Sequence, residues 1–311
     1  MEKNLIEAIK KNISNNLATS PIPIMGVVIY GSWARGMQTE HSDVDILVVS
    51  NAVNPHKHKR GKEIASLKDW LSTGLPLDVM LLTMDECISN FMNHNPLFLD
   101  IASEGIILID SEDFLKNLIA DTKNYIIQRG IIKLDDGWRF PSLYREPTYL
   151  SDVSNKDFAI AMITDGERDF RIGINIMEDG YFDKSVYHFQ QSVEKAVKAV
   201  LICFGEFKKS HFVGAVLIEK LKEIELADNW EERLSYIAGI SGEIEPEVTW
   251  SRYPGIEAGS LWLPYEEYKK EDAVGLKEKS EKVVMITKDF IKWWFKLEED
   301  RMSSKEIKDD E

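Results

Sequence analysis

The chain reads Gly31-Ser32-Trp33-Ala34-Arg35-Gly36 and, after five intervening residues, Ser42-Asp43-Val44-Asp45, and this stretch decides the fold of its N-terminal half. The run before it, Ile24 to Tyr30, is apolar and rich in β-branched residues, which predicts a buried strand that leads into a glycine turn. A second strand is predicted from Asp43 to Val49. Because side chains alternate along a strand, Asp43 and Asp45 should share one face, about 7 Å apart at their backbones.

A third carboxylate belongs to the next apolar run. Leu77 to Leu82 is apolar except for Asp78, and a neighbouring strand would lie about 5 Å away. Asp78 is therefore expected to join Asp43 and Asp45. Three carboxylates repel one another unless a cation lies between them, and a hard divalent ion such as Mg²⁺ prefers oxygen ligands. Acids that hold two ions, beside a turn whose N–H groups hold phosphates, are typical of phosphoryl or nucleotidyl transfer.

This arrangement resembles the minimal nucleotidyltransferase (MNT) family, relatives of DNA polymerase β and of kanamycin nucleotidyltransferase. The pattern is G-S-x-A-R-G, five residues, S-D-x-D and a later lone Asp on a strand, and every position of it is filled. The resemblance implies that Asp43, Asp45 and Asp78 are the catalytic residues and ligate two Mg²⁺ ions, with Mn²⁺ as the alternative. Loss of catalysis with the scaffold kept is the other interpretation, but unneeded buried charge is destabilising, which argues against it.

The same resemblance implies a nucleotide site. Gly31 and Ser32 would bind the β- and γ-phosphates of an NTP, and Ser42 would also belong to the nucleotide-binding set. Arg35 would either lend positive charge to those phosphates or buttress the loop, and the sequence does not separate these two roles.

Size and composition limit the classes of function. The 311 residues are enough for two domains, and 44% hydrophobic with 29% charged residues is typical of a globular protein. A net charge of −15 argues against extended nucleic-acid binding, which depends on lysine and arginine, and suits a cationic or neutral acceptor, unless it serves solubility alone. A basic run from His56 to Lys62 would guide phosphates or, as the favoured interpretation, open a solvated helix.

Cellular location is also constrained. Cys87 and Cys203 lie far apart in helix-like stretches, so they are expected to be packed thiols rather than a disulfide. The N-terminus lacks a signal-peptide core, and no apolar run approaches the roughly 20 residues that cross a bilayer. A cytoplasmic protein without membrane contact is expected.

The predicted fold class is α+β. Residues 1–130 form a nucleotidyltransferase-like α/β domain with a mixed sheet, and residues 131–153, which carry Asp136-Gly137 and two prolines, form a linker or a loop over the cleft. Residues 154–299 form a helical bundle, with helices predicted at 154–178, 182–204, 208–226, 230–240 and 268–297. Residues 300–311 form a charged, disordered tail.

The helical half resembles the HEPN family of bundles. The resemblance rests on Tyr181 to Ala199, on Ser210-His211-Phe212 and on Arg252-Tyr253-Pro254. Many HEPN proteins are ribonucleases with an Arg, four to six residues and a His. The only such match here is Arg35 to His41, inside the nucleotidyltransferase loop, so ribonuclease activity is unsupported.

The bundle offers several uncommitted candidates. Trp250, Arg252 and Tyr253 lie in a Pro- and Gly-bearing loop and would either line an acceptor site or pack over the bundle core. Glu167 and Glu178 are candidates for a general base, and nothing selects either one. His211 would be catalytic or, as the favoured alternative, a capping or packing residue. The stretch from Phe290 to Trp294 fits a bundle core or a dimer face, so a homodimer stays open.

The function predicted is a metal-dependent nucleotidyltransferase. An NTP, with ATP as the favoured donor, would give its NMP to a hydroxyl acceptor held between the two domains, and pyrophosphate would leave. Two alternatives remain: an MNT-type modifier that adenylylates a HEPN toxin, and a non-catalytic module that binds nucleotide and mediates assembly.

Overall fold

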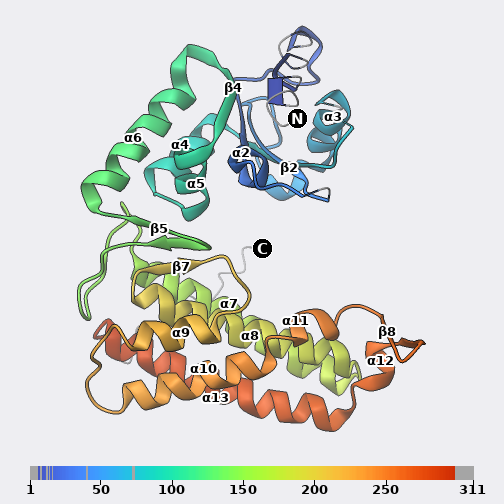
Figure 1. Ribbon diagram of the computed structural model, residues 1–311, viewed down its shortest axis with the longest axis vertical. Helices are drawn as coiled ribbons and strands as arrows, with labels where there is room; N and C mark the ends of the chain where they lie inside the picture. Colours follow the sequence, from blue (N-terminus) through green and yellow to red (C-terminus); the bar gives the residue numbers. More distant parts are fainter. Residues whose placement is uncertain are drawn as a thin grey trace, which may run out of the picture. The chain divides into compact units, whose positions relative to one another are not determined.

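The computed structural model describes residues 6–297 except 8, 12, 14, 16, 40, 72 and 73, so the tail predicted at 300–311 lies outside the described residues. The chain divides into two compact units, Met1–Ile131 and Ile132–Glu311. The first combines helices with a four-stranded sheet and the second is mainly helical, which confirms the α+β class (Figure 1).

The sheet of the first unit is mixed. Its strands are β1 (Gly26–Tyr30), β2 (Val44–Val49), β3 (Leu77–Leu82) and β4 (Ile106–Asp110), in the order β3-β2-β1-β4. β2 and β3 run parallel, whereas β1 is antiparallel to both β2 and β4. Every residue of β1 is buried, as expected of an apolar strand in the middle of a sheet. Strands form around both acidic motifs as predicted, but β2 begins at Val44, so Asp43 precedes the strand instead of opening it.

Helices cover the two faces of this sheet. One face packs against α3 (Gly61–Leu71) and the segment that contains Ile9 and Ile13. The other packs against α4 (Met84–Met92), α5 (Pro96–Glu104) and α6 (Phe114–Arg129), which are grouped on the opposite side from α3 in Figure 1. A short helix, α2 (Gly31–Arg35), follows β1 directly. The strands that carry Asp45 and Asp78 therefore lie in a sheet with a hydrophobic core on each face.

One ion pair ties Arg60, the residue before α3, to α4. Thr83 and Glu86 form a capping box at the start of α4, and their spacing of three residues is the sequence signature of this motif. Nη1 and Nη2 of Arg60 also donate to Glu86, at 2.6 and 2.9 Å, and Nη1 donates to the carbonyl oxygen of Leu81 at 2.9 Å. Arg60 is only 1% exposed. The expectation that the run from His56 to Lys62 opens a solvated helix is therefore wrong for Arg60, because a carboxylate and carbonyl groups satisfy its guanidinium inside the fold.

The segment that follows α6 forms strands. β5 (Ile132–Leu134) and β6 (Gly137–Arg139) make a hairpin around Asp135-Asp136, and β6 pairs with β7 (Glu206–Lys208) of the helical half. Phe207 and Trp138, partners in this register, are both buried. A Cβ on Gly137 would overlap with the carbonyl oxygen of Phe207, so the close approach of β6 to β7 requires glycine there.

The second unit is built on long helices. α7 (Asn155–Glu178), α8 (Phe182–Cys203) and α13 (Lys270–Trp294) pack against one another, with α9 (Gly214–Leu221) and α10 (Trp230–Ile244) beside them (Figure 1). Phe290 and Trp294 are buried, as predicted for a bundle core. α9 is shorter than the predicted 208–226 because its first residues belong to β7 and the turn after it.

Short elements connect α10 to α13. They are α11 (Glu247–Trp250), a hairpin of β8 (Gly255–Glu257) and β9 (Ser260–Trp262), and α12 (Pro264–Glu267).

Cys87 and Cys203 are buried free thiols, as predicted. Among the helices that the described residues form, none has the length and hydrophobicity that crossing a bilayer would require.

Candidate active site

Three side chains form one row across the N-terminal sheet. Tyr30 of β1 lies opposite Asp45 of β2, and Asp45 lies opposite Asp78 of β3. Residues in register on neighbouring strands point to the same face, and their backbones are about 5 Å apart. Tyr30 is 7% exposed, Asp45 is half-buried and Asp78 is exposed. The predicted adjacency of Asp45 and Asp78 is confirmed.

The turn after β1 is shaped around Asp45. Gly31 has φ +72°, a left-handed conformation that strains any residue with a Cβ. A Cβ at this position would also overlap with Oδ2 of Asp45. Gly31 is therefore required twice, by the backbone and by the carboxylate that lies against it. Ser32 follows as the next residue of α2, so the Gly-Ser turn and the carboxylate row meet at one end of the sheet.

The loop from α2 to β2 is held by local hydrogen bonds. Nε1 of Trp33 donates to the carbonyl oxygen of Ser42 at 3.2 Å, and the backbone N–H of Thr39 donates to Oγ of Ser42 at 2.8 Å. These bonds fix Ser42, the residue before Asp43. Asp43 itself is exposed and directly precedes the first residue of β2. Ser42 thus organises the loop, and its predicted contact with nucleotide stays a prediction.

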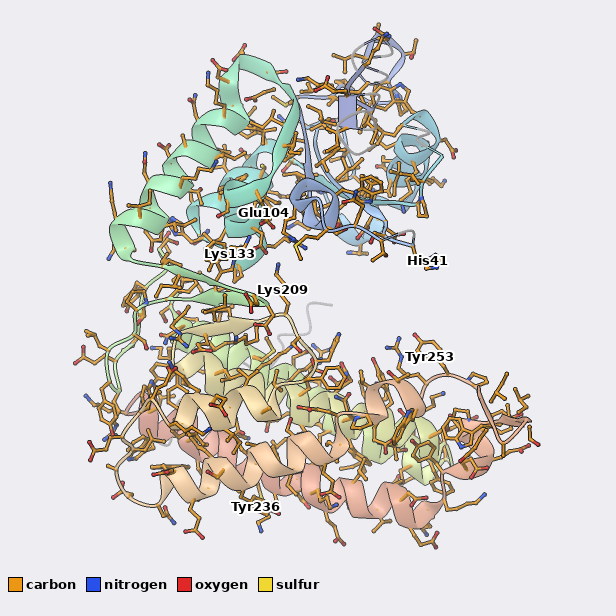
Figure 2. The ribbon with its side chains drawn as sticks, viewed as in Figure 1. His41, Glu104, Lys133, Lys209, Tyr236 and Tyr253 are labelled. Atoms are coloured by element: carbon orange, nitrogen blue, oxygen red, sulfur yellow. The ribbon has the colours of Figure 1, made fainter. Side chains whose placement is uncertain are left out.

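Arg35 is paired within the first unit. Its Nη1 donates to Oε1 of Glu104, at the end of α5, at 2.6 Å (Glu104 is labelled in Figure 2). The Arg35 side chain is 35% exposed. This pair ties α2 to α5, as expected of a buttress, and it leaves a guanidinium at the surface beside the glycine turn.

The negative charge of the carboxylate row acts on Tyr30. Burial, followed by the negative charges of Asp45 and Asp78, raises the pKa of Tyr30 well above its usual range. Within the described part of the chain, no group of three His, Cys, Asp or Glu side chains is arranged to hold a metal ion. The register pairs Asp45 with Asp78, and Asp43 lies two residues before Asp45 in the loop that leads into β2. Two adjacent carboxylates with oxygen donors fit a hard divalent cation.

The three residues predicted for an acceptor site line two different pockets of the helical unit. Arg252 and Tyr253 line one pocket, whereas Trp250 lines another beside the β8-β9 hairpin. The guanidinium of Arg252 lies 4.9 Å from the centre of the Tyr253 ring. Trp250 and Tyr253 are both more than half exposed, so packing over the bundle core does not account for them.

Two other candidates in the helical unit, His211 and Glu167, have ionic partners. Nδ1 of His211 lies 2.9 Å from Oε1 of Glu194, a buried carboxylate that Lys198 also contacts at 2.9 Å. Oε1 of Glu167 pairs with Nζ of Lys288 on α13. His211 is more than half exposed, so the structure presents it as a surface imidazole held by a carboxylate rather than as a buried packing residue.

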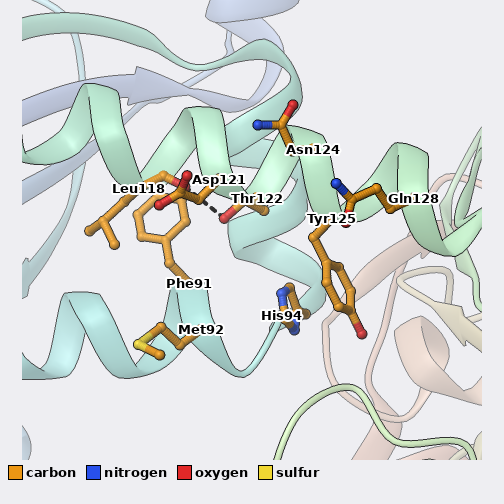
Figure 3. A pocket seen from close by; sticks show the side chains of 9 residues that line it. All are labelled: Phe91, Met92, His94, Leu118, Asp121, Thr122, Asn124, Tyr125 and Gln128. Atoms are coloured by element: carbon orange, nitrogen blue, oxygen red, sulfur yellow. Dashed lines mark hydrogen bonds between the residues drawn. The ribbon is translucent and has the colours of Figure 1, made fainter.

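A pocket of about 480 Å³ opens between α4 and α6 (Figure 3). His94 and Tyr125 stack in it with ring centres 3.4 Å apart. None of the residues predicted to bind nucleotide or metal lines this pocket. It is therefore separate from the carboxylate row.

Sequence reasoning missed several contributors. The sequence places Tyr30 only in a strand and Trp33 only at the variable position of the motif. Glu104 could not be paired with Arg35 because 69 residues separate them. The one local clue was Gly31, whose neighbour in space is Asp45.

The mixed sheet, the glycine turn and the paired carboxylates define a nucleotidyltransferase domain. A family model described as "Nucleotidyltransferase domain" matches residues 7–108, and one described as "HEPN domain" matches residues 161–295. The chain belongs to the proteins that join an MNT-type nucleotidyltransferase domain to a HEPN domain.

Two relatives come from Methanocaldococcus jannaschii. "Putative toxin MJ1304" is 37% identical over 138 residues, which cover 44% of this chain and 91% of the relative. "Putative protein adenylyltransferase MJ1305" is 24% identical over 122 residues, which cover 39% of this chain and 83% of the relative. Each relative corresponds to less than half of this chain.

Solved structures match less closely. The structure titled "Crystal structure of the toxin-antitoxin with AMP-PNP" is 17% identical in sequence, and the match covers 39% of this chain and 92% of the solved chain, with a TM-score of 0.25. A nucleotidyltransferase-like protein from Exiguobacterium sibiricum is 17% identical in sequence, and the match covers 80% of this chain and 82% of the solved chain, with a TM-score of 0.35. TM-scores this low do not establish a common fold.

Proposed function

We propose that this protein is a metal-dependent nucleotidyltransferase that transfers NMP from an NTP, with ATP as the favoured donor, to a hydroxyl group. The observation that carries the proposal is the row in which Asp45 and Asp78 lie side by side next to the Gly31 turn. Asp43, Asp45 and Asp78 would hold Mg²⁺, or alternatively Mn²⁺. A bound divalent ion supplies Lewis-acid stabilisation of the phosphate charge and favours ionisation of the attacking hydroxyl.

The residues of this chain would contribute positioning and charge. Gly31 and Ser32 would direct backbone N–H groups towards the phosphates that leave as pyrophosphate. Arg35, already held by Glu104, would supply positive charge near the same phosphates. Tyr30 would close the inner end of the row, because its pKa keeps the buried phenol neutral and adds no further negative charge. Trp33 and Ser42 would hold the loop that carries Asp43.

The test is transfer from α-labelled ATP in the presence of Mg²⁺, read as pyrophosphate release and as label on an acceptor. The double variant Asp43→Asn, Asp45→Asn should lose at least about 100-fold in rate, as when charge-stabilising groups are removed from an active site. The matched control is Asp69→Asn, Asp85→Asn, which makes the same change of charge at two exposed helix positions. Equal rates in the two double variants would exclude the carboxylate row as the catalytic centre.

A second candidate is adenylylation of a HEPN protein, and the names of the two relatives favour it. One is called a toxin and the other a protein adenylyltransferase, and this chain carries a HEPN domain and a nucleotidyltransferase domain together. Label that stays on this chain, or on an added HEPN protein, after denaturing electrophoresis would support this acceptor. Label only on small molecules would support the first candidate.

A third reading is a nucleotide-binding module without transfer. It predicts that ATP binds equally well with and without Mg²⁺ and that the Asp43→Asn, Asp45→Asn protein binds it as tightly as the parent. Equilibrium dialysis with labelled ATP separates this reading from the other two, because metal-dependent binding requires the carboxylates.

A further inference from the structure

The pocket between α4 and α6 has a chemistry of its own. Its volume of about 480 Å³ is in the range of small-molecule sites. Its lining residues come from α4, from α6 and from the turn that follows α4 (Figure 3). All of them therefore belong to the first unit, and none belongs to the carboxylate row.

One side of α6 gives the pocket its polar groups. Asp121, Asn124 and Gln128 are spaced at i, i+3 and i+7, so they follow one another along the same side of the helix. All three are exposed, and among the described residues none of their side chains has a hydrogen bond or an ion pair. Thr122 differs, because its hydroxyl donates to the carbonyl oxygen of Leu118 at 2.8 Å. One carboxylate and two amides are thus available to a ligand.

The charge of the pocket is negative. Asp121 is the only Asp or Glu among its described lining residues, and none of these residues is Lys or Arg. The positions three and four residues from Asp121 on α6 are Asn117, Leu118, Asn124 and Tyr125, so no basic residue is its neighbour along the helix. The chain as a whole carries −15. An unpaired carboxylate on an acidic protein favours a cationic ligand over an anionic one.

The rest of the wall is aromatic and apolar. The rings of His94 and Tyr125 are stacked, with their centres 3.4 Å apart and their planes inclined by 12°. Phe91 and Leu118 supply an apolar surface. In Figure 3, Asp121 is drawn near Phe91 and Leu118, and the stacked rings lie further along the pocket. A ligand with a flat ring and a charged end matches these two kinds of surface.

The backbone is strained at His94. Its φ is +51°, a conformation that is uncommon for a residue with a side chain. Hydrogen bonds hold the turn around it: Nδ2 of Asn95 donates to Oδ1 of Asn90 at 3.0 Å, and the backbone N–H of Asn95 donates to the carbonyl oxygen of Asn90 at 3.2 Å. Strain of this kind persists where the surrounding structure enforces it, and it is concentrated at ligand sites. Here it accompanies the stacking of the imidazole on Tyr125.

We infer that this pocket binds a small organic ammonium ion that carries an aromatic ring. The ammonium group lies at Asp121, and the ring lies against the stacked side chains of His94 and Tyr125. One helical turn, about 5.4 Å, separates Asp121 from Tyr125, and an ethyl chain spans a similar distance between an ammonium group and a ring. The amide oxygens of Asn124 and Gln128 accept hydrogen bonds from the remaining N–H groups.

The test is isothermal titration of the full chain with 2-phenylethylamine, a cation at neutral pH, without nucleotide or divalent metal. Its N-acetyl derivative keeps the ring and has no charge, and 3-phenylpropanoate keeps the ring and has the opposite charge. 2-Phenylethylamine should bind with a dissociation constant of about 1 mM or less, as expected of a ligand of this size. It should bind about fivefold more tightly than the neutral probe, the upper end of what an exposed ion pair contributes. The anion should bind most weakly.

Two substitutions test the two surfaces. Asp121→Asn should weaken the binding of 2-phenylethylamine about fivefold and leave the binding of the neutral probe unchanged, because it removes only the charge. Tyr125→Leu should weaken the binding of both probes about threefold, the value of one aromatic contact.

The matched controls are Asp69→Asn and Tyr236→Leu. Asp69→Asn removes one charge at an exposed position of α3. Tyr236→Leu removes a ring that, like the ring of Tyr125, lies beside a cation. Both controls should leave the dissociation constant within about twofold. Thermal unfolding of each variant checks that it is folded.

The carboxylate row also attracts cations, so the Asp43→Asn, Asp45→Asn variant is titrated as well, and it should bind 2-phenylethylamine as the parent does. Three results would overturn the inference: no measurable binding, equal binding of the charged and the neutral probe, and binding that Asp121→Asn leaves unchanged. Binding that is lost with Asp43 and Asp45 would also overturn it. The inference does not depend on the proposed function, because the titration involves no transfer. A protein that transfers no label can still bind the amine, and the reverse also holds, so the two proposals fail separately.

Discussion

Replacing Gly31 with alanine tests the link between the turn and the carboxylate row. The substitution has two costs. A left-handed conformation costs a residue with a Cβ about 1–2 kcal/mol, and this applies at φ +72°. The new methyl group would also overlap with the Asp45 carboxylate, and overpacking of this kind costs about 1–3 kcal/mol more.

Gly74 provides the matched control. It has the same φ of +72° in the same unit, but a Cβ there would meet no atom within 4 Å. Gly74→Ala should therefore show only the backbone cost, and Gly31→Ala should be less stable than Gly74→Ala by about 1–3 kcal/mol. Transfer activity should fall in Gly31→Ala, because Asp45 must turn away from Asp78, and persist in Gly74→Ala.

Hydrogen exchange read by mass spectrometry is the assay, because it reports the first unit without assuming that the whole chain unfolds in one step. The informative peptides cover β1 and β2. Equal loss of protection in the two variants would refute the reasoning, since it would mean that Asp45 can leave Gly31 without cost. Intact transfer by Gly31→Ala would refute the proposed role of Asp45 in the row.

Three further outcomes follow from contacts in the first unit. Glu86→Gln should destabilise this unit by about 3 kcal/mol in urea unfolding at pH 7, because the buried Arg60 then keeps its charge without a counter-ion. The hydrogen bond from Arg60 lowers the pKa of Glu86 in the folded protein. The stabilisation from this pair should therefore be present above pH ~4.3 and fade as the pH falls through the lowered pKa of the folded state. Burial raises the pKa of Cys87 to about 12, so at pH 8 only ~10⁻⁴ of the thiol is ionised and a disulfide reagent should modify it only as the unit opens. Trp33→Phe removes the hydrogen bond to the carbonyl oxygen of Ser42, and should cost about 1 kcal/mol and speed amide exchange in residues 36–43.

Each of these has a control. Glu219→Gln breaks an exposed pair with Lys222 and should cost under about 1 kcal/mol, and a loss as small as this in Glu86→Gln would contradict the buried-pair argument. Thiol reactivity is measured in a Cys203→Ser background, and rapid modification of Cys87 in the folded protein would contradict its burial. For Trp33→Phe, unchanged exchange across the loop would show that the indole N–H does not hold it.

Local patterns predicted most of the first unit. β3 begins and ends where the apolar run around Asp78 does, and the capping box at Thr83 starts α4 as expected. These features depend on neighbours in the chain, so one sequence is enough. The pairing of Asp45 with Asp78 followed from the side-chain period of a strand together with the assumption that the two strands are adjacent.

Features that depend on distant partners were not predictable. β5 and β6 have three residues each, too few for a periodic pattern, and β6 pairs with β7 about 70 residues further on. Arg60 is basic and lies in a charged run, yet tertiary partners bury it. At the carboxylate row, Tyr30 and Glu104 act through contacts across the sheet and between helices, which spacing along the chain does not reveal.

The hairpin of β5 and β6 determines how the two halves can be studied apart. A separately expressed HEPN half that starts at residue 154 would strip β7 of its only strand partner among the described residues and leave an unpaired edge, which invites aggregation. A fragment that starts at residue 132 keeps all three strands. The natural cut for expression or limited proteolysis is therefore next to Gly130, more than 20 residues before the first long helix of the bundle.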